Sequence, residues 1–423
     1  MGSHKPVVVL DDDPTGTQAV ADVPVLLRWT PERIAQAVNA GGGAVHLMTN
    51  SRALAPAQAR TRVAEAAAAT FAALPDPLVV LRGDSTLRAH LLEEYEGLRD
   101  ARSDGGSPVL LLVPALPQAG RTTVGGVHFL ERAGQRIPLH ATEYARDGGF
   151  AYRDARLLQW AEDRSGGFFA RAHGREVAPA AVGDALLELS AAPAPAVCVP
   201  DVASNVDLAE VRDGLLTALE AGADIIVRAG PAFAALLSGR AAASLVHAPR
   251  ASSGVLVICG SHVPTTTRQL AVLAATRRDA FVDVDLDAMT SLDAEDEIER
   301  STRAARAALD RSRLAVVATP RDPRALSPDD GARLALNLAS VAGRLADRAD
   351  VVIAKGGITS DVTLRDGIGA DSAHVVGPVA DGVALWRVER PDGGALAYLV
   401  VPGNVGDDDL LARLVDAVLE AQC

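Results

Sequence analysis

The chain has 423 residues with a net charge of −13, and its basic residues form no stripe of the kind that binds nucleic acid. Hydrophobic residues make up 48 % and aromatic residues only 3 %, so the core must be built from Ala, Val and Leu, as suits α/β layers. No apolar run approaches the roughly 20 residues needed to span a bilayer, and the length suits two or three domains.

The first half alternates short aliphatic runs with Ala-rich helical segments, which predicts a mostly parallel sheet with helices on both faces. Strands are expected at residues 7–10, 23–27, 44–48, 78–81, 109–113, 196–199 and 225–227. Helices such as 56–74 and 208–221 lie between them. The Gly- and Arg-rich stretch 146–175 is predicted to be irregular.

The second half repeats this alternation after a small, Pro-containing stretch at 240–254. Strands are expected at 255–259, 281–284, 315–318 and 351–354, and near 374–376, 383–388 and 397–401. Ser327 and Pro328 predict the start of a helix that includes Leu345, and another helix follows Gly406. We therefore predict two α/β domains, residues 1–245 and 253–423, each a mostly parallel sheet flanked by helices, with an interdomain cleft.

Cysteine usage and the start of the chain indicate the compartment. The three cysteines are scattered and odd in number, so they form no disulfide framework and suggest a reducing environment. The beginning lacks the basic region and long apolar run of a signal peptide, so a cytoplasmic protein is expected. The sequence leaves open whether the chain forms a homo-oligomer.

Two polar motifs follow predicted strands in the first half, where open α/β sheets bind ligands. Residues 11–18 read DDDPTGTQ, and repulsion among the three carboxylates must be offset by a polyol, a cation or arginines. Residues 82–88 read RGDSTLR, a set suited to a carboxylated polyol because Arg binds carboxylates and Asp accepts from hydroxyls. A plain acidic turn and an ion-paired helix start are the alternatives. Residues 49–52 could add a third polar corner, although a local turn is favoured there.

Lys355 is notable because only two of the 41 basic residues are lysine. Arg cannot replace a compact ammonium that meets a phosphate as a point charge, so a phosphate contact is expected. A solvated lysine at a strand end, or one that only shapes the entrance of the loop, is the alternative. Lys355 ends a strand and opens the turn KGGITS, which includes Ser360. The segments 260–267 and 402–406 likewise lie between a strand and a helix, and three such loops on one sheet edge suit a nucleotide. Neither a Walker motif nor GxGxxG is present.

These motifs, in this order, resemble the four-carbon acid sugar kinase family over nearly the whole chain. The markers are DDDPTGTQ, RGDSTLR, PALPQAGRTTVGG at 114–126, GSHVPTTTRQL at 260–270, KGGITSDV at 355–362 and PGNVGDDDLL at 402–411. The resemblance implies a sugar-acid-binding domain followed by an ATP-binding domain. The chain differs from many relatives at Gln18-Ala19, where they have Asn-Asp, and at Ile358, where they have Glu.

The resemblance also implies roles for individual residues. The sugar acid would contact Asp12, Asp13, Arg82, Asp84, Ser85 and Arg88. ATP would contact Ser261, Thr265, Gly356, Gly357, Thr359, Gly403 and Asn404, together with Lys355 and Ser360 of the same turn. No residue is assigned as a resident metal ligand.

A kinase mechanism follows as a hypothesis. Mg²⁺ bridges the phosphates of ATP, and Arg82 and Arg88 orient the carboxylate of a 3-oxo-tetronate, threonate, erythronate or related acid. A carboxylate from Asp12, Asp13 or Asp84 accepts the proton of the attacking hydroxyl. The alternatives are a sensor that binds the same ligands without turnover, a kinase of a different hydroxy acid, and a dehydrogenase, which the missing GxGxxG disfavours.

Overall fold

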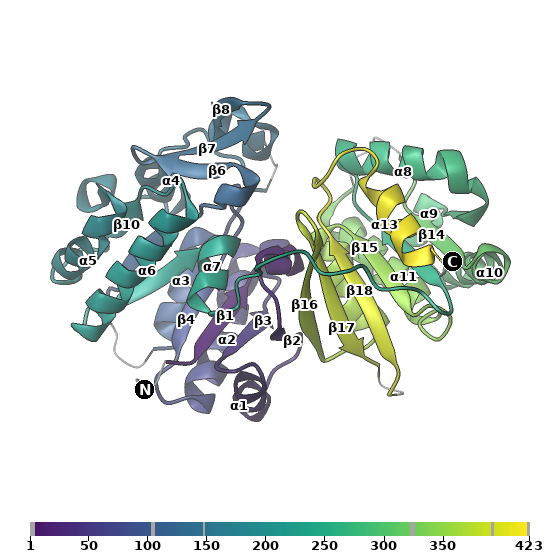
Figure 1. Cartoon of the computed structure of the whole chain (residues 1–423), viewed down its shortest axis with the longest axis horizontal. Coiled ribbons are helices and arrows are strands. Elements are labelled where there is room, and N and C mark those ends of the chain that lie inside the picture. Colours follow the sequence, from purple (N-terminus) through teal and green to yellow (C-terminus); the bar gives the residue numbers. More distant parts are fainter. Residues whose placement is uncertain (1–4, 103–105, 147–148, 322–325, 391–392, 421–423) are drawn as a thin grey trace. The chain divides into compact units, whose positions relative to one another are not determined.

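The computed structural model describes residues 5–102, 106–146, 149–321, 326–390 and 393–420. It divides into two compact units, Met1–Ala241 and Ala242–Cys423. Each unit is a sheet covered by helices (Figure 1), so the predicted α/β class with two domains is confirmed. Within the described ranges, no helix combines the length and apolar character needed to cross a membrane.

The sheet of the N-terminal unit is parallel throughout. Its strands lie in the order β2 (Val23–Leu26), β3 (Ala44–Met48), β1 (Val7–Asp11), β4 (Leu78–Arg82), β11 (Ile225–Ala229), β5 (Val109–Val113), β10 (Val197–Pro200) and β9 (Arg175–Val177). Except for the short β9, each was predicted from an aliphatic run, because strands buried on both faces carry little polar alternation.

Helices cover both faces of this sheet. Alternate side chains of β1 show the two cores: Val8 and Leu10 enter one apolar cluster, and Val7 and Val9 enter the other. The first cluster is covered by α1 (Pro31–Ala40), α2 (Pro56–Ala73), α3 (Leu91–Asp100) and α4 (Leu157–Arg164). The second is covered by α5 (Val182–Ser190), α6 (Asn205–Glu220) and α7 (Pro231–Leu237).

Two parts of the N-terminal unit differ from the prediction. A separate antiparallel sheet is formed by β6 (Arg121–Val124), β7 (Val127–Arg132) and β8 (Gln135–Pro138). The stretch 146–175 was expected to be irregular, but it contains α4, because Leu157 and Trp160 are buried in the core.

The C-terminal unit combines a parallel sheet with an antiparallel extension. The strand order is β13 (Phe281–Asp283), β14 (Leu314–Ala318), β12 (Val255–Cys259), β15 (Val351–Lys355), β18 (Ala395–Val401), β17 (Val383–Glu389) and β16 (Ser372–Ala380). The pairs from β13 to β18 are parallel, whereas β17 pairs antiparallel with both β18 and β16.

Helices of this unit also pack on the sheet. Helices α8 (Pro264–Arg277) and α13 (Leu410–Leu419) cover one face, and α11 (Pro328–Gly343) covers the opposite face (Figure 1). The other α-helices among the described residues of this unit are α9 (Leu286–Thr290), α10 (Glu295–Ser312) and the short α12 (Gly357–Val362). Ser327 caps α11 as predicted, but the helix ends before Leu345.

Candidate functional site

The carboxyl ends of three neighbouring strands bring the motifs of the N-terminal unit together. Strand β1 lies between β3 and β4, and these strands end at the paired positions Asp11, Met48 and Arg82. The segments 11–13, 49–52 and 82–88 therefore leave the sheet side by side, which is the expected position for ligand-binding turns.

Arg82 lies beneath these turns. Its side chain is 2 % exposed, and its Nε donates to Asp11 Oδ1 at 2.6 Å. Asp11 Oδ2 also lies 3.1 Å from Nδ1 of the buried His46. A side chain at Gly16 would collide with the Arg82 guanidinium, so glycine there allows the 13–17 turn to close over it. Arg82 thus supports the aspartate turn from below, and its predicted contact with substrate stays a prediction.

Asp13 and Asp84 are held ionised by shared arginine partners. Burial disfavours their charge, but Arg52 pairs with Asp13, and its Nη1 lies 3.7 Å from Asp84 Oδ2. Arg88 donates to Asp84 at 2.7 Å. Against burial, Arg52 and Arg82 lower the pKa of Asp13, and Arg88 and Arg52 lower the pKa of Asp84. Both carboxylates therefore serve as charged acceptors at neutral pH.

Asp12 is in a different state. Its side chain is 1 % exposed, and neither carboxylate oxygen has a hydrogen-bond partner among the described residues. Arg82 Nη1 lies 3.1 Å from Asp12 Oδ1 as an ion pair. Burial raises the pKa of Asp12 to about 7, although the charges of Arg82 and Arg52 oppose the rise. Among the three candidate aspartates, Asp12 alone is placed to gain and lose a proton near neutral pH.

The RGDSTLR segment forms a tight polar turn after β4. Thr86 and Arg88 both donate to Asp84, and Leu87 adopts φ 66°, a left-handed conformation that is rare for a leucine. The Leu87 side chain is buried, and this anchor keeps the turn in place. Ser85 is also buried, so a substrate can contact it only at its hydroxyl group, and that contact stays a prediction.

Several residues of this site had no role in the sequence-based assignment. Arg121 donates to Ser85 Oγ at 3.1 Å, and the guanidinium groups of Arg121 and Arg88 both lie over the ring of Tyr144. The buried pair of Glu94 and Arg228 lies nearby, and the charge of Glu94 adds to the rise in the Asp12 pKa. These partners come from distant parts of the chain. Arg228 is a charge within the apolar strand β11, and Arg121 belongs to the 114–126 motif, but neither signal shows which groups the side chains contact.

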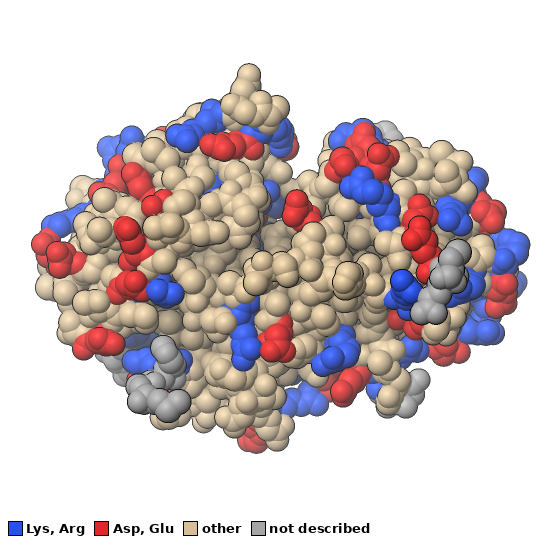
Figure 2. Space-filling model, in the orientation of Figure 1, with Lys and Arg blue, Asp and Glu red and all other residues tan. Residues whose placement is uncertain are grey.

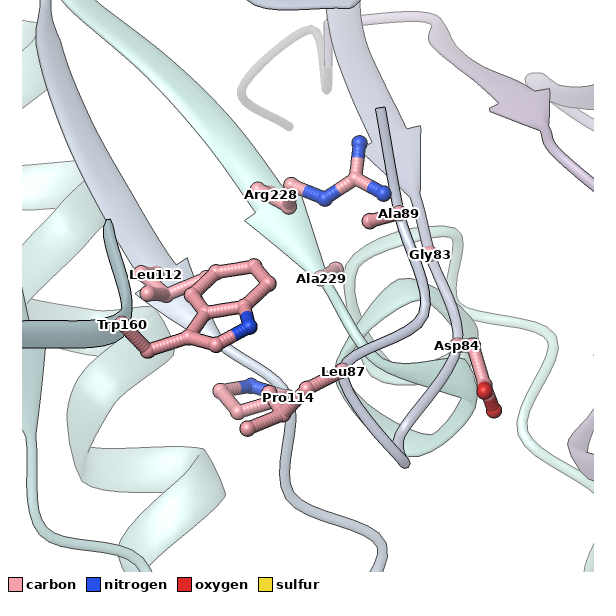
Figure 3. Close-up of a pocket in the computed structure, with 9 residues that line it drawn as sticks. All are labelled: Gly83, Asp84, Leu87, Ala89, Leu112, Pro114, Trp160, Arg228 and Ala229. Carbon is pink, nitrogen blue, oxygen red and sulfur yellow. The ribbon is translucent and has the colours of Figure 1, made fainter. Parts of the chain in front are cut away.

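A small cavity beside the 82–88 turn is too small for a sugar acid. It lies among Leu112, Trp160 and Ala229, and the carboxylate of Asp84 points away from it (Figure 3). Its volume is about 10 Å³, which admits at most one water molecule. The candidate site is therefore the polar edge of the strands and not this cavity.

Three loops of the C-terminal unit meet at Ser261. They follow the adjacent strands β12, β15 and β18, which end at the paired positions Cys259, Lys355 and Val401. A Cβ at Gly403 would lie 2.5 Å from Ser261 Oγ, and one at Gly356 would lie 3.2 Å from Ser261 Cβ. Gly356 also has φ +110°, which favours glycine. The sequence correctly placed these loops on one sheet edge.

The predicted nucleotide-binding residues differ in exposure. Ser261, Thr265, Gly357, Gly403 and Asn404 are partly exposed, whereas Lys355, Gly356, Thr359 and Ser360 are buried. Ser360 Oγ donates to Gly356 O at 2.8 Å, so it closes the turn on itself.

Lys355 lies inside the unit. Its side chain is 0 % exposed, and Nζ donates to the carbonyl oxygen of Pro402 at 2.7 Å. Burial lowers the pKa of Lys355 to about 8. The ammonium therefore joins the 355–360 turn to the 402–406 loop, which is a different position from the phosphate contact expected from the sequence.

The charge of the visible surface and the grouping of metal-ligating side chains are two further features that can mark a binding site. On the face in Figure 2, acidic and basic side chains are interspersed. Among the described residues, no three His, Cys, Asp or Glu side chains form a group that could hold a metal ion.

Comparison with known proteins identifies the family of each unit. Residues 7–237 match the family described as the sugar-binding N-terminal domain, and residues 256–411 match the nucleotide-binding C-terminal domain. The chain is thus a two-domain protein of the sugar-binding and nucleotide-binding class. It belongs to the four-carbon acid sugar kinase family.

Individual relatives are more distant. The chain is 32 % identical to D-erythronate kinase of Heliobacterium modesticaldum over 58 % of its own length and 53 % of the relative, so that match spans about half of the relative. It is 25 % identical to D-threonate kinase of Salmonella typhimurium over 89 % of the chain and 88 % of the relative.

Solved structures show the same fold. A Haemophilus influenzae protein with a domain of unknown function has a TM-score of 0.62 at 19 % identity, covering 96 % of this chain and 98 % of that one. A Salmonella typhimurium protein solved under the name tRNA synthase has a TM-score of 0.64 at 20 % identity, with the same coverage. At these identities the likeness concerns the fold alone.

Proposed function

We propose that this sugar-acid kinase transfers the γ-phosphoryl group of ATP to a hydroxyl of a small sugar acid, such as a 3-oxo-tetronate, threonate, erythronate or a branched 3-oxo acid. The observation that carries the proposal is the state of Asp12, a buried carboxylate without hydrogen-bond partners that is surrounded by charged groups. A sensor needs contacts with its ligands but no proton acceptor, whereas a kinase needs a group that accepts the hydroxyl proton.

Asp12 serves as the general base in this proposal. The hydroxyl proton passes to an Asp12 oxygen as the hydroxyl oxygen bonds to the γ-phosphorus and the bond to the β-phosphate oxygen breaks. Asp13 and Asp84 are poor bases because arginines lower the pKa of each. As charged acceptors, they instead receive hydrogen bonds from the other hydroxyls of the substrate.

Arg88 and Arg121 bind the carboxylate of the acid. Arg88 is half-buried and pairs with Asp84, and Arg121 Nε is buried without a hydrogen-bond partner among the described residues. Both lie against Tyr144 and so are held near one another. Arg82 keeps the aspartate turn in position from beneath.

ATP binds the loops that meet at Ser261 in the C-terminal unit. Their glycines and hydroxyls resemble the backbone cradles that receive phosphate, and Mg²⁺ accompanies ATP as part of that substrate. Transfer requires the two sites to meet during the reaction. We also propose that the protein is located in the cytoplasm.

The experiment is a coupled assay of ADP release with MgATP and a panel of tetronates, 3-oxo-tetronates and branched 3-oxo acids. A kinase releases ADP only with one or a few of these acids and forms the phosphorylated acid. Binding of both ligands without turnover would favour the sensor. Tight NAD binding with no ADP release would favour the dehydrogenase.

A further inference from the structure

The loop 402–407 has its carbonyl oxygens held by buried side chains from two other elements. Lys355 Nζ of β15 donates to Pro402 O at 2.7 Å. Thr266 Oγ1 of α8 donates to Gly403 O at 2.8 Å. Gln269 Nε2, one turn further along α8, donates to Val405 O at 2.9 Å and to Asp407 O at 2.7 Å. All three donor side chains are fully buried.

The planar peptide bond fixes the direction in which the amide groups of this loop point. In a planar trans peptide, the C=O of one residue and the N–H of the next point in opposite directions. Because the carbonyls of Pro402, Gly403 and Val405 are turned toward buried donors, the N–H groups of Gly403, Asn404 and Gly406 point away from them. Within the described part of the chain, these three N–H groups have no hydrogen-bond acceptor.

The cost of the arrangement indicates that it serves the loop. Gln269 Oε1 is buried with no partner among the described residues, and an unpaired buried acceptor is destabilising. A leucine at this position would avoid that cost but would leave two loop carbonyls without their donor. The contribution of Gln269 is therefore to the conformation of the loop, through its two donated hydrogen bonds.

We infer that Lys355, Thr266 and Gln269 are positioning residues that turn the carbonyls of the 402–407 loop inward and present its amide groups to the phosphates of ATP. The inference rests on the proposed function and adds Thr266 and Gln269 to its nucleotide site. It also changes the role of Lys355: the ammonium polarises the Pro402–Gly403 peptide and so strengthens the Gly403 N–H as a donor, without itself touching phosphate.

The test compares matched variants of the full chain. Thr266→Val removes the hydroxyl at constant shape, Thr266→Ser keeps it, and Gln269→Met removes the amide donors. Thr276→Val is the control, because Thr276 lies further along α8 and donates to Leu273 O within its own helix. ATP binding by isothermal titration calorimetry needs no turnover, and KM for ATP and for the sugar acid is measured alongside, with circular dichroism as the check of folding.

We expect Thr266→Val and Gln269→Met to weaken ATP binding and to raise the KM for ATP by roughly 10-fold. This is the effect of losing about one hydrogen bond between a loop amide and a phosphate in each variant. The KM for the sugar acid stays unchanged, and Thr266→Ser and Thr276→Val bind ATP like the parent. Folded Thr266→Val and Gln269→Met proteins with parental ATP affinity would overturn the inference but leave the kinase proposal standing. A parent chain that binds no ATP would instead overturn the proposed function itself.

Discussion

Replacing Asp12 with asparagine should make the protein more stable and nearly inactive at the same time. An ordinary aspartate ionises near 3.8, whereas burial raises the pKa of Asp12 to about 7. That difference corresponds to roughly 4 kcal/mol of unfavourable ionisation in the folded state at high pH. An asparagine side chain would remain neutral and keep nearly the same shape, so the substitution removes this cost.

The sign of the effect depends on pH. Between about pH 4 and pH 7 the folded unit keeps the Asp12 proton that the unfolded chain has lost, so the free energy of unfolding falls as pH rises through that window. The free energy of unfolding of the asparagine variant does not fall in this way, because asparagine carries no ionisable group. Its advantage over the parent should be close to zero at pH 4 and should grow to at most roughly 4 kcal/mol by pH 8.

Urea unfolding at pH 4, 6 and 8 measures the stability, and the ADP-release assay measures the activity. The value of kcat should fall by roughly 10²–10⁴-fold, the usual contribution of a general base. Asp13→Asn is the matched control: it removes the ionised partner nearest to the mostly buried Arg52, which keeps Asp84 at 3.7 Å, and it should destabilise the protein by a few kcal/mol at pH 8. An Asp12→Asn protein less stable than the parent at pH 8, or one with parental kcat, would refute the reasoning.

Three further predictions concern other parts of the two sites. Gly403→Ala should raise the KM for ATP at least 10-fold in initial-rate assays, because its Cβ would lie 2.5 Å from Ser261 Oγ; parental kinetics would show that the loop yields easily. Arg121→Gln should raise the KM for the sugar acid by roughly 10- to 100-fold with the KM for ATP unchanged, as for the loss of a charged hydrogen bond, and equal effects on both would contradict the assignment. The buried Lys355, whose pKa is about 8, should make the free energy of unfolding rise between about pH 8 and 10.5; Lys355→Met should abolish that rise in denaturant titrations, and an unchanged slope would place its origin elsewhere.

The sheets could be predicted closely because their signal is local. A strand buried on both faces must be apolar along nearly its whole length, and the runs 109–113 and 255–259 coincide with β5 and β12. The β6–β8 sheet was missed for the converse reason. Its strands carry polar residues, and the hairpin signal of Gly125-Gly126, two glycines between short strands, was not used.

The site could be predicted only as a set of turns. Parallel strands end at a common edge, so the sequence placed 11–13 and 82–88 together without knowing the pairings. Which charges neutralise one another depends on side-chain direction and on contacts between distant residues. Arg52 was therefore assigned to a local turn, although it bridges Asp13 and Asp84. Lys355 was expected to contact a phosphate, although its side chain lies inside the unit and donates to Pro402 O.

In the proposed function the two units bind anions by different chemistry, and this difference follows from what each ligand offers. A sugar acid has one carboxylate and several hydroxyls at fixed positions, so it calls for charged side chains with defined direction, such as Arg88 and Asp84. A triphosphate has many equivalent oxygens, so a loop of oriented amides suffices, and its side chains remain free to vary. Ile358, which is 50 % exposed at the start of α12, stands where many relatives carry Glu. If phosphate recognition resides in the backbone, as we propose, this exchange leaves it intact, and the sequence departure at 358 is compatible with a working nucleotide site.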